Sequence, residues 1–156
     1  MVCRGKSLIT IRNSQRSIPL NTKQIKKDIE RIVSFVGYKG FGVFIWITTN
    51  ATIRRYNKQY RDKDAATDVL SFPFYPHISP GERIEDATED EKYLGDIIIS
   101  AEYVYKDTIR WNQTFEQRIR VLLVHSICHL LGYDHIKDSD YHVMKREEER
   151  IIKALF

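Results

Sequence analysis

The sequence contains little cysteine and no long hydrophobic segment. Its two cysteines, Cys3 and Cys128, lie far apart, which excludes a disulfide framework and favours a reducing compartment. No apolar run approaches the roughly 18 residues that a membrane-spanning helix needs, and the longest, VFIWI at 43–47, has the length of a strand. The N-terminal stretch MVCRGKSLITIRN lacks the continuous apolar core of a secretory signal. We therefore expect a cytoplasmic protein with no membrane partner.

Acidic residues are scarce in the first part of the chain. Residues 1–63 hold 14 Lys and Arg against three Asp and Glu, a net charge of +11, whereas residues 64–156 hold 11 against 18, a net charge of −7. A basic surface steers a protein towards polyanions such as RNA. Solvated helix faces explain the same excess of Lys and Arg, so charge alone leaves both interpretations open.

Length and residue pattern predict one α+β domain. At 156 residues and 18.5 kDa, and without internal repeats, residues 1–156 have the size of a single domain. Strands are expected at 7–13, 42–49, 68–74 and 94–100. Helices are expected with caps at Asn21 or Thr22, at Asn50 and at Asp138 or Ser139, from about Ala101 to Trp111, and after a capping box of Thr114 and Gln117. This mixture predicts a small mixed β-sheet packed against helices.

Several segments carry more specific expectations. The strand at 42–49 is apolar almost throughout and is expected to be buried on both faces. The strand at 68–74 contains Pro73, which lacks a ladder donor and favours a sheet edge. The helix after Asn50 is expected to direct three side chains inward, namely Ile53, Tyr56 and Tyr60. Residues 76–93 show little periodicity, which indicates a mobile surface loop.

The segment HSICHLLGYDH, residues 125–135, has the spacing of a metal site. His125 and His129 lie four residues apart and therefore on one face of a helix. His135 follows six residues later, after Gly132, and the whole spacing matches the ligand positions of the long zincin pattern H-E-x-x-H-x-x-G-x-x-H. Three protein ligands leave a fourth position of zinc open. The pattern predicts one Zn²⁺ per chain, whereas core histidines bonded to backbone are the alternative.

The glutamate base of the zincin pattern is missing. Ser126 occupies its position and has no useful basicity near neutral pH. Zinc alone lowers the pKa of a bound water to about 7, so a dedicated base is not required. Asp134 is a candidate for orienting a histidine, or for satisfying its own turn, and Asp68 and Asp96 are weaker candidates for assisting the reaction. The sequence leaves the identity of any general base open.

Other residues near the motif are expected to be structural. Cys128 should point away from the metal and pack as a small hydrophobic residue. Gly132 should end its helix in a left-handed conformation. His77 and His142 are expected at the surface, and the acidic run at 147–149 on the solvent side of the last helix.

Three ordered motifs together resemble one known family. HSICHLLGYDH is similar to the H-G-x-x-H-L-x-G-Y-D-H signature of the YbeY family of metal-dependent endoribonucleases. NKQYRDKDAATDVLSFPF at 57–74 and LGDI at 94–97 resemble two further blocks of that family, so the likeness spans essentially the whole chain. One departure is Ser126, where the family usually has glycine.

The resemblance implies a fold, an activity and a set of site residues. It implies a zincin-like α+β domain that holds zinc with His125, His129 and His135, and a functional arginine at Arg61. It also implies hydrolysis of single-stranded RNA during ribosomal RNA maturation, including the 3′ end of the small-subunit RNA, and in ribosome quality control. The expected partners are the RNA precursor and the small ribosomal subunit or its proteins.

An arginine suits such a reaction. Its planar, permanently charged fork binds phosphate in a bidentate manner and offsets charge in the transition state. An ion pair of Arg61 with Asp62 or Asp64 is the structural alternative. Aromatic residues interleave with cations in the same region and are candidates for stacking unpaired bases, namely Tyr56, Tyr60, Phe72, Phe74 and Tyr75 with Lys58, Arg61 and Lys63. Packing in the core is the alternative for most of these rings.

A phosphodiester substrate also accounts for the missing glutamate. The group is already anionic, so its cleavage mainly requires a Lewis acid, an oriented nucleophile and cations around the phosphate. Whether water or the ribose 2′-OH attacks is left open. Two rival functions remain: a metal-dependent hydrolase of another bond, such as a peptide bond, and a non-catalytic RNA-binding assembly factor with a structural zinc.

Overall fold

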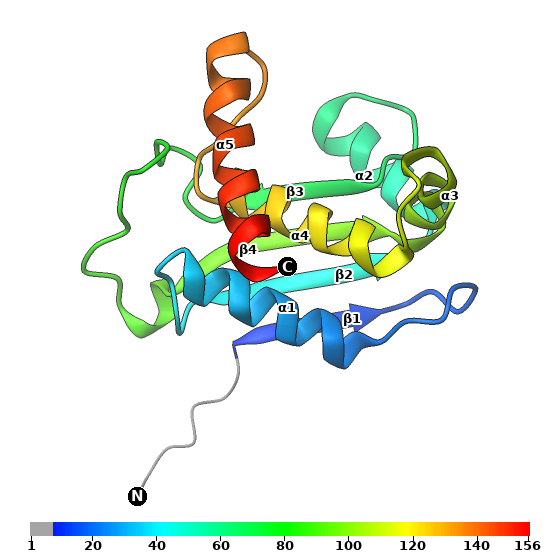
Figure 1. Ribbon diagram of the computed structural model, residues 1–156, viewed down its shortest axis with the longest axis horizontal. Coiled ribbons are helices and arrows are strands. Elements are labelled where there is room, and N and C mark those ends of the chain that lie inside the picture. Colours follow the sequence, from blue (N-terminus) through cyan, green and yellow to red (C-terminus); the bar gives the residue numbers. More distant parts are fainter. Residues whose placement is uncertain (1–7) are drawn as a thin grey trace, which may run out of the picture.

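The computed structural model describes residues 8–156, which are built around a four-stranded mixed sheet (Figure 1). Its strands are β1 (Ile9–Asn13), β2 (Gly42–Thr48), β3 (Val69–Pro73) and β4 (Tyr93–Ser100), in the order β1-β2-β4-β3. β2 is parallel to both β1 and β4, whereas β3 pairs with β4 in the antiparallel direction. The predicted α+β class is confirmed, and Pro73 lies on an edge strand as expected. The predicted start of the first strand at residue 7, and Cys3, lie outside the described residues.

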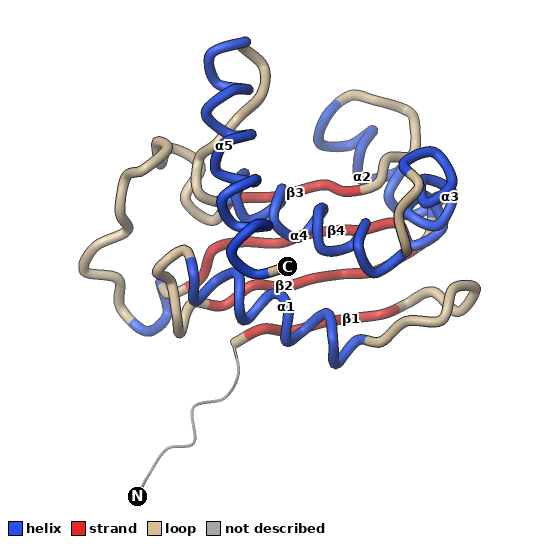
Figure 2. The backbone as a smooth tube through the Cα atoms, in the orientation of Figure 1, coloured by secondary structure: helices blue, strands red, loops and turns tan. Residues whose placement is uncertain are grey.

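Five α-helices of residues 8–156 surround the sheet. They are α1 (Thr22–Phe35), α2 (Asn50–Arg61), α3 (Ala101–Trp111), α4 (Phe115–Leu130) and α5 (Asp138–Leu155), and a short 3-10 helix, η1, spans Glu89–Glu91. Figure 2 shows α1, α4 and α5 together in front of one face of the sheet. α2 contacts β3 and β4 near one end of the sheet and also touches α3. None of the helices in residues 8–156 is long and apolar enough to cross a bilayer.

Side-chain caps explain where the helices begin. The Asn21 side chain accepts a hydrogen bond from the Gln24 N–H at 3.0 Å, so Asn21 is the N-cap of α1. Thr114 and Gln117 exchange reciprocal bonds and form the predicted capping box of α4.

Two predicted caps are wrong. The cap of α2 is Thr49, whose hydroxyl accepts the Thr52 N–H, whereas Asn50 is already helical and its side chain accepts a hydrogen bond from the Ser100 hydroxyl at 2.7 Å. The last helix begins at Asp138 itself, after a backbone turn at Lys137 without a side-chain cap. At the start of α2, the Asn50 side chain that the local pattern assigned to the cap binds instead to Ser100, which is distant in sequence.

The core lies on the face of the sheet that α1 and α4 cover. Val43, Ile45 and Ile47 of β2 are 0% exposed on this side, and burial of each such side chain is worth about 1.5–3 kcal/mol. Phe44 and Trp46 point to the other face and are only half-buried, so the prediction that this strand is buried on both faces is wrong. The reason is that, among the described helices, α2 alone packs on that face, near the β3 end.

The apolar surface that α2 buries is correspondingly small. Ile53 is fully buried against Leu70 and Ile98, which form a second apolar cluster. Tyr56 packs partly against this cluster, whereas Tyr60 is 53% exposed, so its predicted inward orientation is wrong. The last turn of α2 extends beyond the apolar cluster.

The segment 76–93 lies on the surface, as predicted, and is attached to the connection between α1 and β2. The Arg83 guanidinium donates a hydrogen bond to the Val36 carbonyl at 3.0 Å and lies 4.2 Å from the centroid of the Tyr38 ring. The backbone N–H of Ile84 donates to the Tyr38 hydroxyl at 3.1 Å. These bonds fix the middle of the segment against the body of the domain.

Candidate metal centre

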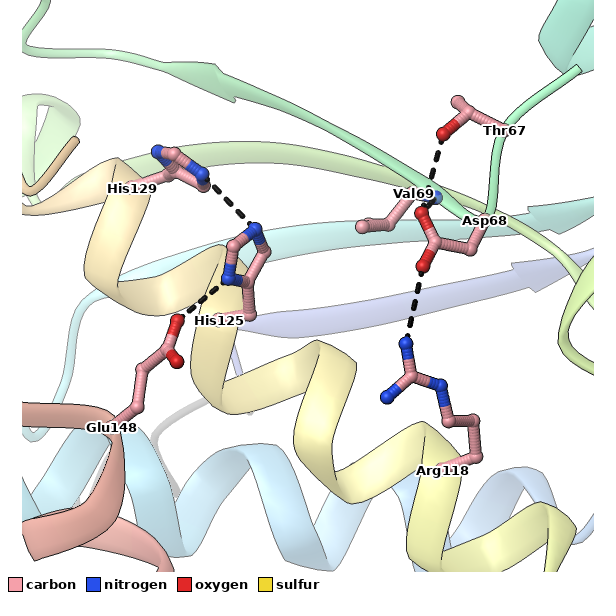
Figure 3. Close-up of polar contacts among 7 residues, drawn as sticks. All are labelled: Thr67, Asp68, Val69, Arg118, His125, His129 and Glu148. Carbon is pink, nitrogen blue, oxygen red and sulfur yellow. Dashed lines mark hydrogen bonds and ion pairs between the residues drawn. The ribbon is translucent and has the colours of Figure 1, made fainter. Parts of the chain in front are cut away.

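Helix α4 and the turn that follows it bring the three predicted histidines together. His125 and His129 lie one turn apart on α4, and their Nε2 atoms are 3.1 Å from each other (Figure 3). The ring of His135 lies 5.6 Å from that of His125 and 5.0 Å from that of His129, measured between centroids. One nitrogen from each ring lies within 4.8 Å of the other two. The predicted convergence of the three imidazoles is therefore present.

Gly132 makes this convergence possible. It adopts a φ of +91°, the left-handed conformation predicted for the end of α4. A Cβ atom at this position would lie 2.1 Å from the carbonyl oxygen of Ile78. The next residue, Tyr133, returns its N–H to the Cys128 carbonyl at 3.0 Å, which reverses the chain towards His135.

Each helical histidine is oriented by a partner at Nδ1. Nδ1 of His125 lies 2.6 Å from Oε1 of Glu148 on α5, as Figure 3 shows. Nδ1 of His129 lies 3.0 Å from the carbonyl oxygen of Tyr133, to which it can only donate. Carboxylates and carbonyls at this position hold the proton on Nδ1 and leave Nε2 free to bind a metal.

Glu148 was missed by the sequence prediction that placed 147–149 on the solvent side. Only Glu149 is exposed, whereas Glu147 and Glu148 are half-buried. The signal was present, because Glu148 lies four residues after Met144 and three before Ile151, both of which are buried. A carboxylate on the apolar face of a helix needs a partner there, and a histidine of the metal motif is a candidate.

The donor set fits a metal ion. Zn–N bonds of about 2.0–2.1 Å in tetrahedral geometry place two ligand nitrogens roughly 3.3 Å apart, close to the 3.1 Å between the Nε2 atoms of His125 and His129. Burial, followed by repulsion from His125 and His135, lowers the pKa of His129 to about 4. His129 is thus neutral near pH 7, which is the form that binds metal. Two Nε2 lone pairs that face each other repel, and a cation bound between them makes this arrangement favourable.

The histidines line an open cleft of about 720 Å³ that also contains Arg61. Arg61 is exposed at the end of α2, and its Nη2 donates to the Ser71 carbonyl on β3 at 2.9 Å. Asp64 pairs with Arg54 and Lys58 instead, so the structure does not form the alternative ion pair between Arg61 and Asp64. The structure therefore places the predicted arginine in the same cleft as the histidines.

Asp68 also lines the cleft, but its carboxylate already has several donors. Oδ1 accepts the Val69 N–H at 2.8 Å and the Thr67 hydroxyl at 3.2 Å, and Oδ2 lies 3.4 Å from Nη2 of Arg118 (Figure 3). These contacts join the start of β3 to α4. Asp68 is positioned to shape the cleft wall.

The other two carboxylates considered from sequence have different surroundings. Asp134 lines the cleft and accepts the N–H of His135 at 2.6 Å, which supports its interpretation as a turn residue. Asp96 accepts a hydrogen bond from the Tyr93 hydroxyl and lines a groove on the opposite face of the sheet. Asp96 is therefore not brought to the histidines.

The predictions that Cys128 is buried and that His77 and His142 lie at the surface are confirmed. Cys128 is 1% exposed, and burial raises the pKa of its thiol well above the ordinary value. Ser126 is 0% exposed, and its Oγ has no hydrogen-bond partner among residues 8–156, so its side chain does not line the cleft. His77 and His142 are exposed and lie outside the histidine cluster.

An α+β domain that directs three imidazoles into an open cleft has the layout of a metal-dependent hydrolase. Comparison with known families specifies it further: the model of the family described as Endoribonuclease YbeY matches residues 10–156. The chain belongs to this family.

Individual relatives agree over nearly the full chain. Endoribonuclease YbeY of Homo sapiens is 33% identical over 147 residues, which cover 94% of this chain and 87% of that protein. Endoribonuclease YbeY of Caldicellulosiruptor bescii is 36% identical over 154 residues, which cover 94% and 96%. The solution structure of TM1509 from Thermotoga maritima, 24% identical, shares the fold with a TM-score of 0.54 over 94% of this chain and 90% of that one.

Proposed function

We propose that the protein is a zinc-dependent endoribonuclease that cleaves single-stranded regions of ribosomal RNA precursors. The proposal includes maturation of the 3′ end of the small-subunit RNA, a role in ribosome quality control, and action in the cytoplasm beside the small subunit. Residues 1–156 act as one domain with one Zn²⁺. Membership of the YbeY family supports the activity. The observation that carries it is the presence of His125, His129, His135 and Arg61 in one cleft.

The histidines have the role of metal ligands in this proposal. When bound, the zinc supplies a Lewis acid for the phosphate and its nucleophile. Glu148 and the Tyr133 carbonyl fix the two helical rings, so their Nε2 atoms keep their direction without reorganisation. The exposed ring of His135 completes the set on the solvent side of the cleft.

Arg61 has the role of the phosphate-binding residue. One edge of its guanidinium is held by the Ser71 carbonyl, and its carbon atom Cζ lies 5.2 Å from the centroid of the Phe72 ring. The cation therefore has a fixed position while it remains exposed in the cleft. Such a cation stabilises the charge that grows on the phosphate oxygens in the transition state. Lys63 lines the same cleft and adds positive potential.

Metal analysis followed by an RNA cleavage assay tests the proposal. We expect the purified protein to contain about one zinc per chain and to cleave a ribosomal RNA precursor, and His129→Ala to remain folded and bind RNA without cutting it. His77→Ala, an exposed histidine outside the cluster, serves as the matched control. A 2′,3′-cyclic phosphate end identifies the ribose hydroxyl as the nucleophile, whereas its absence throughout the time course identifies water.

The same preparation separates the rival functions. Chelator-sensitive hydrolysis of casein or a peptide library, without RNA cleavage, contradicts the proposal in favour of a peptidase. If His129→Ala unfolds the protein, or leaves its function in cells intact, the zinc is structural and the protein is an RNA-binding assembly factor.

A further inference from the structure

The face of the sheet opposite α1, α4 and α5 carries a groove that the metal centre does not use. The groove has a volume of about 510 Å³, and we define the aromatic groove by six of its lining residues, Arg12, Phe44, Trp46, Tyr56, Tyr60 and Phe72. These residues come from β1, β2, β3 and α2. The pairing of Phe44 with Asp96 and of Trp46 with Ile98 places the rings of β2 in the middle of this face.

The rings of the groove form a continuous series. Trp46 contacts the edge of Tyr56 at 5.5 Å between centroids, Tyr56 stacks with Tyr60 at 6.0 Å, and Tyr60 contacts Phe72 at 5.2 Å. The indole N–H of Trp46 donates to the Ser14 hydroxyl at 2.8 Å, which fixes the plane of that ring. Tyr60 is 53% exposed. A series of partly exposed rings in fixed orientations is a platform on which unpaired bases stack.

The charged lining of the groove consists of the guanidinium of Arg12 and the carboxylate of Asp96, which accepts a hydrogen bond from the Tyr93 hydroxyl. The guanidinium of Arg12, on the edge strand β1, lies 4.8 Å from the Trp46 ring centroid, at the end of the ring series. Of the four cations on α2, Arg54 and Lys58 pair with Asp64, whereas Arg61 lies over the ring of Phe72 at the border of the groove. Aromatic residues and arginine are enriched in protein interfaces as well, so the choice of nucleic acid rests on the contact between the groove and the cleft at Arg61, whose guanidinium lies over Phe72.

The groove approaches the cleft of the metal centre at the edge strand β3. Arg61 lines that cleft, and its guanidinium lies over the ring of Phe72, which lines the groove. Phe72 belongs to β3, the edge strand, so one strand of RNA can pass from the cleft around this edge to the groove. The two surfaces therefore meet at the residue proposed to bind the phosphate.

We infer that the aromatic groove binds the unpaired bases of the RNA segment that adjoins the phosphodiester held in the cleft. This inference rests on the proposed RNA substrate and extends it with a second contact surface. It explains why aromatic residues of the 56–72 region are left partly exposed instead of being packed in the core. It also provides a physical basis for a preference for single strands, since paired bases cannot stack on protein rings.

Trp46 reports directly on occupation of the groove. The sequence has two tryptophans, so Trp111→Phe leaves Trp46 as the single tryptophan, whose emission is excited selectively over that of the tyrosines. The zinc-free protein is titrated with a single-stranded oligoribonucleotide of about 12 nucleotides and with a trinucleotide. We expect the longer oligonucleotide to change the Trp46 emission and the trinucleotide to leave it nearly unchanged.

Substitution of Tyr60 tests the energetic contribution. Tyr60→Ala should weaken binding of the longer oligonucleotide by roughly 10-fold, and Tyr60→Phe, which keeps the ring, should bind nearly as tightly as the unmodified chain. Tyr105→Ala is the matched control, since Tyr105 is 56% exposed and lies on α3, outside the groove. Thermal unfolding of each variant verifies that the fold is kept. With an active enzyme, Tyr60→Ala should raise KM for the longer substrate and leave kcat unchanged.

The outcomes separate this inference from the proposed function. RNA cleavage with a silent Trp46 and an unaltered Kd in Tyr60→Ala overturns the inference and leaves the function intact. A response of Trp46 that Tyr60→Ala weakens, without any RNA cleavage, supports the inference and rejects the function. If hydrogen exchange shows that small-subunit proteins protect the groove while RNA does not, the occupant is a protein and the inference is wrong.

Discussion

Nδ1 of His125 and Oε1 of Glu148 lie 2.6 Å apart, and this contact joins α4 to α5 at the metal centre. The two residues are separated by 23 positions in the chain. A carboxylate at Nδ1 holds the imidazole in the tautomer whose Nε2 accepts a metal, and it increases the basicity of that nitrogen. The last helix therefore contributes to the site although it supplies no ligand.

This contact predicts an effect of Glu148 on metal affinity. Glu148→Gln should weaken zinc binding by about 10- to 100-fold because the amide lacks the negative charge that polarises His125. Competition with a chelating indicator measures the Kd. Glu149→Gln is the matched control, since it makes the same change one residue further along at an exposed position. Equal affinities of the two variants would show that the contact does not orient the ligand.

The convergence of the three histidines could be predicted from the sequence because its geometry is local. His125 and His129 share one helix, and Gly132 fixes the turn that returns His135, so spacing alone determines the arrangement. The contact with Glu148 could not be predicted in the same way, because it depends on how α5 packs against α4. A partner on another helix is set by tertiary packing.

The limits of the strand predictions have a similar cause. The apolar composition of β2 predicts burial on both faces. Phe44 and Trp46 are nevertheless half-buried, because among the described helices α2 alone covers their side of the sheet. The number of layers around a sheet is a property of the whole chain, which apolar content does not reveal. Pro73, in contrast, was placed correctly at an edge, because a missing backbone donor excludes a central position.

Arg61 is expected to contribute geometry as well as charge. Arg61→Lys keeps the positive charge but loses the planar fork and the bond to the Ser71 carbonyl. We expect kcat/KM for RNA cleavage to fall by about 100-fold, the effect typical of losing one donor that stabilises transition-state charge. Arg55→Lys, an exposed position on the same helix, is the control. A similar loss in both variants would show that the effect is not specific to the position of Arg61 in the cleft.

The metal-free protein should lose stability in acid through His129. Its pKa is lowered from 6.5 to about 4 by burial, then by His125 and His135. Between these values the unfolded chain binds a proton that the folded chain excludes, so the free energy of unfolding decreases as pH falls from 6.5 towards 4. One proton gives a slope of at most about 1.4 kcal/mol per pH unit. The actual slope is smaller because solvent partly reaches the ring.

Urea unfolding in the presence of chelator, at several pH values across this interval, measures the slope. His129→Gln has no ionisable ring, so its free energy of unfolding should decrease less steeply with falling pH. The difference in slope corresponds to at most one bound proton. Above pH 6.5 the ring is neutral in both the folded and the unfolded chain, so no stability is lost through its protonation. Parallel curves for the two proteins would contradict the origin assigned to the acid sensitivity.

Gly132 is expected to be essential for both the turn and its contact with the surface segment. Gly132→Ala places a Cβ 2.1 Å from the Ile78 carbonyl oxygen at a φ of +91°, whereas Gly40→Ala meets no atom within 4 Å at a φ of +93°. The strain of the left-handed backbone, about 1 kcal/mol, is therefore common to both variants. The steric clash is specific to Gly132, and we expect a total destabilisation of about 3 kcal/mol or more, measured by urea unfolding. Zinc affinity should fall only in Gly132→Ala, because His135 is displaced with the turn. Equal destabilisation of the two variants would mean that the chain at Ile78 does not pack against the histidine turn.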